Sequence, residues 1–203
     1  MSEPIDPRRV DWSGDNPGIY LKTSPDGDAF SSLCVWFRIA VSPFGPGHVL
    51  VLFEDPTRAA GWPDVANVCL ADNEPLARWL IDGYCKKFGV FRGAAAFEKL
   101  DVLPLDTVDT AGTDLSASRV AVAGNGIEIE LIWKQLGAPF AADVPPEQSA
   151  TGAHRMLSVF VESTDASITV NGRRLPGVPV PRPFLGRTAS SAFLAFSETW
   201  IAA

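Results

Sequence analysis

Residues 33–55 read LCVWFRIAVSPFGPGHVLVLFED. Two runs of apolar, β-branched and aromatic residues, 33–41 and 48–55, flank the breaker SPFGPG. Runs of this length and composition are typical of buried strands, and the prolines and glycines between them favour a turn. The stretch therefore predicts two strands of a hairpin. A third run, DVANVCLAD at 64–72, predicts a further strand.

One helix is predicted after these strands, over about residues 73–87. Asp72 or Asn73 can cap its N-terminus. Pro75 is tolerated in the first turn, and Gly89 suits the position that follows a helix. Apolar or small residues recur on one face at helical spacing: Leu76, Trp79, Leu80, Gly83 and Tyr84. We expect this face to pack on the sheet.

The C-terminal half returns to strand patterns. Asn125-Gly126 and Asn171-Gly172 each stand between strand-like runs, and Asn-Gly suits the positive φ angles of a type I′ hairpin turn. The segment PGVPVPRP, 176–183, lacks the backbone donors of a strand ladder, so it predicts an extended edge or crossover. A last strand is predicted in SAFLAFSETWI, 191–201.

The chain has 203 residues, of which 46% are apolar, and this is enough for one domain with a buried core. Residues 1–32 are rich in proline and glycine, so we expect an extended N-terminal arm laid over the body. Residues 33–203 are expected to form a single domain. Many strands with one interposed helix predict the α+β class, with a large, β-rich, barrel-like antiparallel sheet.

Charge and cysteine content narrow the class of protein. The 24 acidic and 17 basic residues give a net charge of −7, which repels nucleic acid and anionic membranes. Cys34, Cys69 and Cys85 form no CxxC pair and are odd in number, so neither a disulfide framework nor a metal site is expected. No apolar run approaches the ~18 residues that cross a bilayer, and the first residues lack the apolar region of a signal peptide. We therefore expect a cytoplasmic protein without metal or cofactor.

Lys86 and Lys87 are adjacent cations among the apolar neighbours Tyr84, Cys85 and Phe88. An amine must lose its proton before it can attack a carbonyl, and burial and a neighbouring positive charge both favour the neutral form. The alternative is a solvated pair, which the negative end of the helix dipole would favour. In an unbroken helix, Lys87 rather than Lys86 would fall on the apolar face.

Other polar residues allow two interpretations each. Arg38 interrupts an apolar strand, so it either faces solvent or holds an anion in a cavity. His48 and His154 each stand at the start of a predicted strand, and we favour structural roles for both. The motifs GxSxG, HExxH, GxGxxG and the P-loop are absent from the sequence.

The sequence resembles the acetoacetate decarboxylase family in three places. Asp72–Pro75 (DNEP) and Tyr84–Gly89 (YCKKFG) look like the family's helix start and its lysine segment, and residues 36–54 resemble a strand, turn and strand that end in an active-site glutamate. The resemblance extends over residues 33–203, and Cys85 stands where the family usually has proline. It implies a β-rich cone or barrel with the lysine inside, often in homo-oligomers.

The resemblance implies that Lys86 is the nucleophile, Lys87 its electrostatic perturber, and Glu54 a group that positions substrate or moves protons. We expect a Schiff-base-forming lyase that acts on a small keto acid by decarboxylation or by related aldolase or dehydratase chemistry. Arg38, Tyr84 and Phe53 are the expected substrate-binding residues. Glu54 is expected to line the same cavity as Lys86, because a carboxylate after an apolar strand needs a polar partner. The alternative function is a non-catalytic β-barrel that binds a small ligand.

Overall fold

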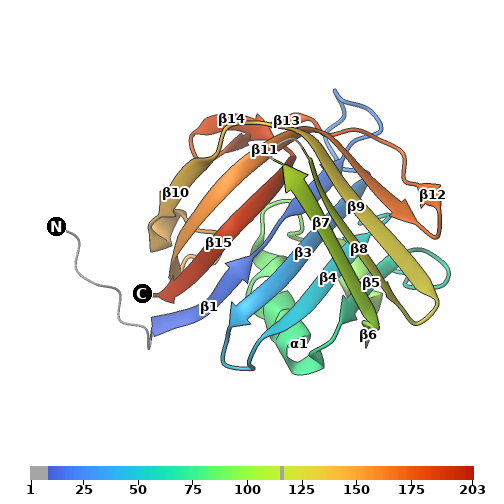
Figure 1. The fold of residues 1–203 in the computed structure, drawn as a ribbon, viewed down its shortest axis with the longest axis horizontal. Coiled ribbons are helices and arrows are strands. Elements are labelled where there is room, and N and C mark those ends of the chain that lie inside the picture. The colour runs from blue at the N-terminus through green and yellow to red at the C-terminus, as the bar shows by residue number, and fades with distance from the viewer. Residues whose placement is uncertain (1–8, 115–116) are drawn as a thin grey trace.

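The fold is built around one large mixed sheet of 13 strands (Figure 1). The computed structural model describes residues 9–114 and 117–203. The strands of this sheet are β1 (Val10–Asp15), β2 (Gly18–Leu21), β3 (Ser32–Val41), β4 (Gly47–Phe53), β5 (Asn67–Ala71), β6 (Val102–Pro104), β7 (Thr107–Asp114), β8 (Ala117–Gly124), β9 (Ile127–Leu136), β10 (Phe140–Val144), β11 (His154–Val170), β12 (Arg173–Arg174) and β15 (Ala192–Ala202). The β-rich class with one main helix is thereby confirmed.

The main path of the sheet runs β6-β5-β4-β3-β1-β15-β11-β9-β8-β7, with β2, β10 and β12 attached to it. Its pairs are antiparallel except β5–β6, which is parallel. A separate hairpin is formed by β13 (Pro181–Phe184) and β14 (Arg187–Ser190). The amides of Leu105 and Asp106 donate to the carbonyls of Ala71 and Ala123, at 3.0 and 2.8 Å. The first bond continues the pairing of edge strand β6 with β5, and the second continues that of edge strand β7 with β8, so the chain passes directly from one edge strand to the other.

The hairpins expected from local sequence are confirmed. β3 and β4 pair antiparallel around the predicted breaker, and β5 pairs with β4. Asn125 and Gly126 have φ angles of 50° and 77°, and Asn171 and Gly172 have 47° and 76°. Both pairs thus adopt the left-handed conformation expected of an Asn-Gly turn.

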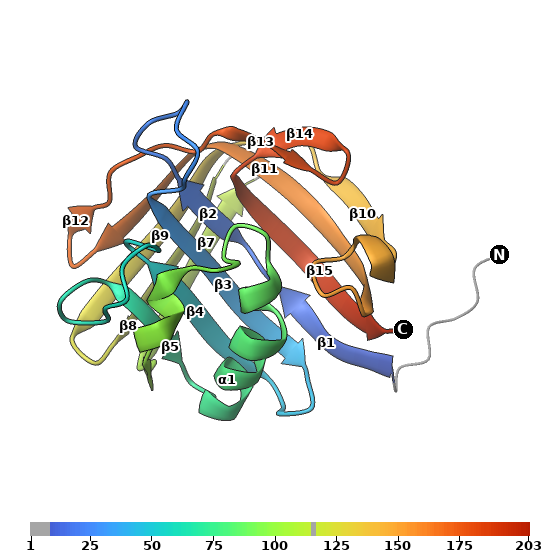
Figure 2. The same cartoon turned by 180° about the vertical axis from the view of Figure 1, so that it is seen from behind.

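β3 and β4 are buried on both faces, which explains their continuous apolar runs. Figures 1 and 2 show them between α1 on one side and β8 and β9 on the other. Side chains that pack on the α1 side are Val35, Phe37, Val49, Val51 and Phe53. Side chains that pack toward β8 and β9 are Cys34, Trp36, Leu50 and Leu52. The alternation of strand side chains therefore supplies two cores from one pair of strands.

The single α-helix, α1 (Glu74–Gly83), begins where the sequence predicts and ends earlier. The Asn73 side chain accepts a hydrogen bond from the Leu76 amide at 3.1 Å, which caps the N-terminus. Tyr84 leaves the helical conformation with φ −132° and ψ −59°, and Cys85–Lys87 form a separate 3-10 turn. Two more such turns lie at Ala95–Lys99 and Pro146–Gln148.

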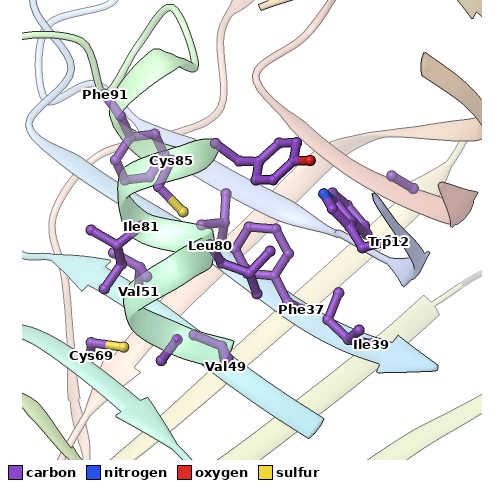
Figure 3. Packing of buried hydrophobic residues seen from close by; sticks show 14 of the residues in the cluster. Trp12, Phe37, Ile39, Val49, Val51, Cys69, Leu80, Ile81, Cys85 and Phe91 are labelled. Atoms are coloured by element: carbon purple, nitrogen blue, oxygen red, sulfur yellow. The ribbon is translucent and has the colours of Figure 1, made fainter. Parts of the chain in front are cut away.

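The apolar face of α1 packs on the sheet as predicted. Leu76, Ala77 and Leu80 are fully buried. Figure 3 shows Leu80 and Ile81 pointing from the helix toward β3 and β4, with Trp12 closing the cluster from β1. Trp12 also lies edge-on to Tyr84, with ring centroids 5.7 Å apart. The turn after α1 is thus anchored to the first strand of the chain.

The segment predicted as an N-terminal arm contributes two strands, β1 and β2, to the interior of the sheet. Gly14 and Gly18, in these two strands, serve close packing rather than turns. A Cβ atom at Gly14 would lie 2.2 Å from the Arg38 carbonyl oxygen, and one at Gly18 would lie 2.8 Å from the Phe193 ring. A proline- and glycine-rich composition therefore gave a wrong interpretation over residues 10–21. Residues 1–8 of the predicted arm lie outside the described residues.

The proline-rich segment 176–183 is extended, as predicted. Val178 forms a bridge with Lys22, and residues 181–184 are β13. Within the described residues, no helix has the length and apolarity needed to cross a membrane.

Candidate functional site

The two lysines of the predicted site lie on the surface. The Lys86 amine donates to Asp82 at 2.6 Å, one helical turn earlier, and its side chain is 47% exposed. The amine also lies 5.7 Å from the centre of the Phe97 ring. Lys87 is exposed as well. The 3-10 turn that contains both lysines buries Cys85 and leaves Lys86 and Lys87 exposed. The desolvation of the amines, on which the prediction depends, is therefore not observed.

The remaining predicted residues are dispersed. The Glu54 carboxylate forms an ion pair with Arg173 at 2.7 Å and accepts a hydrogen bond from the Ala66 amide at 3.1 Å. Arg38 pairs with Asp15 and is 62% exposed, so the solvent-facing alternative is confirmed. Phe53 is fully buried in the core. The structure does not bring Lys86, Glu54 and Arg38 together.

Tyr84 is buried and belongs to a hydrogen-bond network at the start of β1 and β11. Its hydroxyl donates to Asp11 at 3.0 Å, and the same carboxylate oxygen lies 2.8 Å from Nε2 of His154. Nδ1 of His154 lies 2.8 Å from the Thr151 hydroxyl, which is 3.2 Å from that of Ser149. His154 thus joins three segments, in agreement with the structural role favoured for it.

A cavity of about 540 Å³ lies next to this network. Aromatic side chains form much of its lining: Phe30, Phe88, Phe160, Phe184, Phe193 and Trp200. The buried or half-buried polar residues of the lining are Asn16, Tyr20, Ser149, Arg182 and Glu198, and Arg92 and Gln148 are its exposed polar residues. Pockets of this size and character are typical small-molecule sites. Neither Lys86 nor Glu54 lines it.

Glu198 is a buried carboxyl group in the cavity, only 3% exposed. Its Oε1 accepts hydrogen bonds from Nε1 of Trp200 at 2.7 Å and from Nδ2 of Asn16 at 3.2 Å. Burial raises the pKa of Glu198 from 4.5 to about 7, although the two hydrogen bonds act in the opposite direction. The group therefore exchanges between its neutral and charged forms near neutral pH.

A bulge in β15 places Glu198 in the cavity. β15 pairs with β11 through Phe196↔Val159 and Thr199↔Leu157, so two residues of β15 oppose one of β11. Ser197, within this bulge, has a φ of 51°. Phe196 and Ser197 are exposed, whereas Glu198 and Trp200 turn inward. The strand alternation of the sequence alone does not reveal this shift.

Two cations line the cavity, the exposed Arg92 and the half-buried Arg182. Arg182 is the one that lies among the aromatic rings. Its guanidinium lies 4.7 Å from the ring centre of Phe184, 5.5 Å from that of Tyr20 and 5.8 Å from that of Phe193. Its Nε is buried without a hydrogen-bond partner. Burial lowers the pKa of Arg182, and Tyr20 and Glu162 partly counter this effect. Over residues 9–114 and 117–203, no carboxylate forms an ion pair with Arg182.

Tyr20 lies within electrostatic range of both charged groups. Burial raises the pKa of Tyr20, the positive charge of Arg182 lowers it and the negative charge of Glu198 raises it. The phenol therefore keeps its proton at neutral pH and is available as a hydrogen-bond donor.

Sequence reasoning did not select Glu198, Arg182, Tyr20 or Asn16. They come from β15, β13, β2 and the β1–β2 connection, which are distant in sequence. Two local features were available: Glu198 stands in the otherwise apolar and aromatic run AFLAFSETWI, and Arg182 stands between two prolines. Neither feature indicates a cavity without the tertiary fold.

No protein-family model, curated protein or solved structure matches this chain. The fold and the site define a β-rich protein with one main helix and an aromatic cavity lined by a buried carboxyl group, Glu198, and a half-buried cation, Arg182.

Proposed function

We propose that this protein binds a small organic anion with an aromatic or similarly apolar body in the cavity of Glu198 and Arg182. We base this on one observation: the half-buried Arg182 guanidinium lies among three aromatic rings, its Nε is enclosed without a hydrogen-bond partner, and no carboxylate of the described residues pairs with it. The fixed fork of a guanidinium matches a carboxylate in bidentate geometry. A bound carboxylate would supply the missing partner.

The nearest competing acid is already engaged. Glu162 pairs with Arg187 at 2.9 Å and accepts the Ser190 amide at 2.9 Å. The aromatic faces around Arg182 compensate only part of its burial, since a cation over a ring gains roughly 0.5–2 kcal/mol. An isolated buried charge costs more than this, so the site favours an anionic ligand.

The lining restricts the rest of the ligand. The aromatic side chains of the cavity favour a flat or branched apolar group, because aromatic rings pair edge-to-face or offset. The cavity volume of about 540 Å³ suits a molecule of one ring with a short side chain. An aryl carboxylate meets all these conditions.

Binding can be tested by isothermal titration calorimetry with phenylacetate and with the neutral isostere phenylacetamide. The wild-type protein should prefer phenylacetate. Arg182→Met should weaken phenylacetate binding about 10- to 100-fold, the loss expected for a charge-assisted hydrogen bond, and change phenylacetamide binding less. Arg119→Met is the matched control, because Arg119 lies on β8 and pairs with Asp109 and Glu130 outside the cavity. Equal affinity for phenylacetate in wild-type and Arg182→Met protein would contradict the assignment.

A second candidate is the imine-forming lyase. Phe88 and Gly89 follow the lysines directly and line the cavity, so the lysine turn borders it. In this candidate the curved sheet is a divergent form of the decarboxylase cone, a keto acid is the substrate, and the chain forms a homo-oligomer. Borohydride with a keto acid would then leave one reduced adduct on the peptide with Lys86, and Lys86→Ala would abolish it. Absence of any adduct on the wild-type protein would reject this candidate.

A further inference from the structure

The two oxygens of Glu198 have different surroundings. Oε1 accepts both hydrogen bonds, from Trp200 and Asn16. Oε2 accepts no hydrogen bond from the part of the chain that the structure describes. The enclosed polar atoms that lack a partner do not include Oε2. Since Glu198 lines the cavity, Oε2 is the oxygen available to a ligand. The carboxyl group is thus held at one oxygen and free at the other.

We propose that Glu198 is the general base of a proton transfer, and that it acts on an aromatic 2-oxo acid whose carboxylate is bound by Arg182. This assignment rests on the proposed function, because it requires the same ligand anchor. The reaction is the interconversion of the keto and enol forms of the bound acid.

The step balances without any further reactant. Oε2 takes a proton from the carbon between the carbonyl and the aromatic ring, so that the C–H bond breaks and an O–H bond forms. The electron pair of the C–H bond becomes the C=C bond of the enolate, and the carbonyl π pair moves to the oxygen. Tyr20 lines the same cavity, 5.5 Å from its ring centre to the Arg182 guanidinium, and its protonated phenol would donate a hydrogen bond to this oxygen. Return of a proton from Glu198 to either atom completes the cycle.

The surroundings of Glu198 suit this role. A general base is most effective when its pKa is near the working pH, and burial brings the pKa of Glu198 to about 7. The charged or titratable groups around it are Asp15 from β1 and, in the cavity lining, Tyr20 from β2, Arg182 from β13 and the exposed Arg92. No cation among the described residues forms an ion pair with Glu198, so its charge is not neutralised in advance.

The test uses phenylpyruvate in deuterium oxide, with the exchange of its C3 protons followed by proton NMR. We expect the wild-type protein to accelerate exchange above the buffer rate. Glu198→Gln keeps the shape and the acceptor oxygen for Trp200, and it should reduce the protein-dependent exchange by about 100-fold or more, the contribution of a positioned general base. Glu130→Gln is the control. Glu130 lies on β9 and pairs with Arg119 outside the cavity. The Glu130→Gln variant should accelerate the exchange of the phenylpyruvate protons as much as the wild-type protein does.

Phenylacetate binding separates the two claims, because phenylacetate has the carboxylate and ring but no ketone. If both wild-type and Glu198→Gln proteins bind phenylacetate, and wild-type exchange of phenylpyruvate does not exceed the buffer rate, the catalytic role is refuted and the binding site stands. Equal exchange by wild-type and Glu198→Gln proteins also refutes it. If phenylacetate and phenylpyruvate both fail to bind, the proposed function and this inference fail together.

Discussion

Substitution of Glu198 by Gln should change how the stability of the protein depends on pH. The folded protein holds the pKa of Glu198 at about 7, against 4.5 for the free group. Between these two values, the unfolded chain has released the proton and the folded protein has retained it. The folded state binds more protons there, so its stability falls as pH rises.

The magnitude follows from the difference in pKa. Each pKa unit corresponds to about 1.4 kcal/mol, so Glu198 should remove about 3 kcal/mol of stability between pH 4 and pH 8. The stability is fully present below pH 4.5 and is lost as pH rises through 7. Gln cannot release a proton, and it keeps an acceptor for Nε1 of Trp200. The Glu198→Gln variant should therefore lack this loss.

Urea unfolding followed by tryptophan fluorescence at several pH values measures the effect, since urea adds no charge and the chain has six tryptophans. The free energy of unfolding of the wild type minus that of Glu198→Gln should decrease by about 3 kcal/mol from pH 4 to pH 8. The same difference for Glu130→Gln, which removes one member of a surface ion pair, should change by about 1 kcal/mol at most. A difference curve for Glu198→Gln that is flat, or that rises with pH, would refute the burial of a carboxyl group at this position.

Two further substitutions test the helix and the core. Asn73→Ala should cost about 1–2 kcal/mol of unfolding free energy, because Asn73 caps α1 and its amide donates to the carbonyls of Phe44 and Pro46 at 2.9 and 3.2 Å. Asn73→Asp keeps the cap and should lose less in the same urea titration. Leu80→Ala should cost about 2–5 kcal/mol, because Leu80 is fully buried. Val41→Ala, at a position 54% exposed, should stay within about 0.5 kcal/mol, and equal losses for the two would contradict the packing of α1 on the sheet.

The fold was predictable where it depends on local sequence. Asn-Gly pairs need φ > 0 and stand at hairpin turns, so Asn125 and Asn171 located two turns correctly. The cap at Asn73 located the start of α1. The helix end was predicted too late, because Tyr84 satisfies the apolar spacing and yet leaves the helical conformation to reach Asp11. The end of the helix thus depends on a contact between two residues that are 73 positions apart in the sequence.

The site was not predictable by the same means. The lysine pair was conspicuous because two charges stood among apolar neighbours, and the structure resolves this by burying the neighbours and exposing the charges. Glu198 and Arg182 look ordinary in sequence, and they line one cavity only because β15 bulges at Ser197 and the separate hairpin β13–β14 contributes Arg182 to the lining. The same limitation applies to Gly14 and Gly18, whose roles depend on partner atoms from other strands.

The unpaired charges of the cavity are difficult to explain by stability alone. Glu198 and Arg182 have opposite charges and line one cavity, yet they form no ion pair with each other in the described parts of the chain. Pairing them would offset part of the cost of desolvation, and replacing both with apolar residues would remove it. Instead, three aromatic rings surround the Arg182 guanidinium, and the Glu198 carboxyl group accepts hydrogen bonds at a single oxygen. Both groups therefore stay available to a ligand. Departures from the usual rules of burial are expected at functional sites, and this one is the reason for our proposal that a ligand occupies the cavity between the two groups.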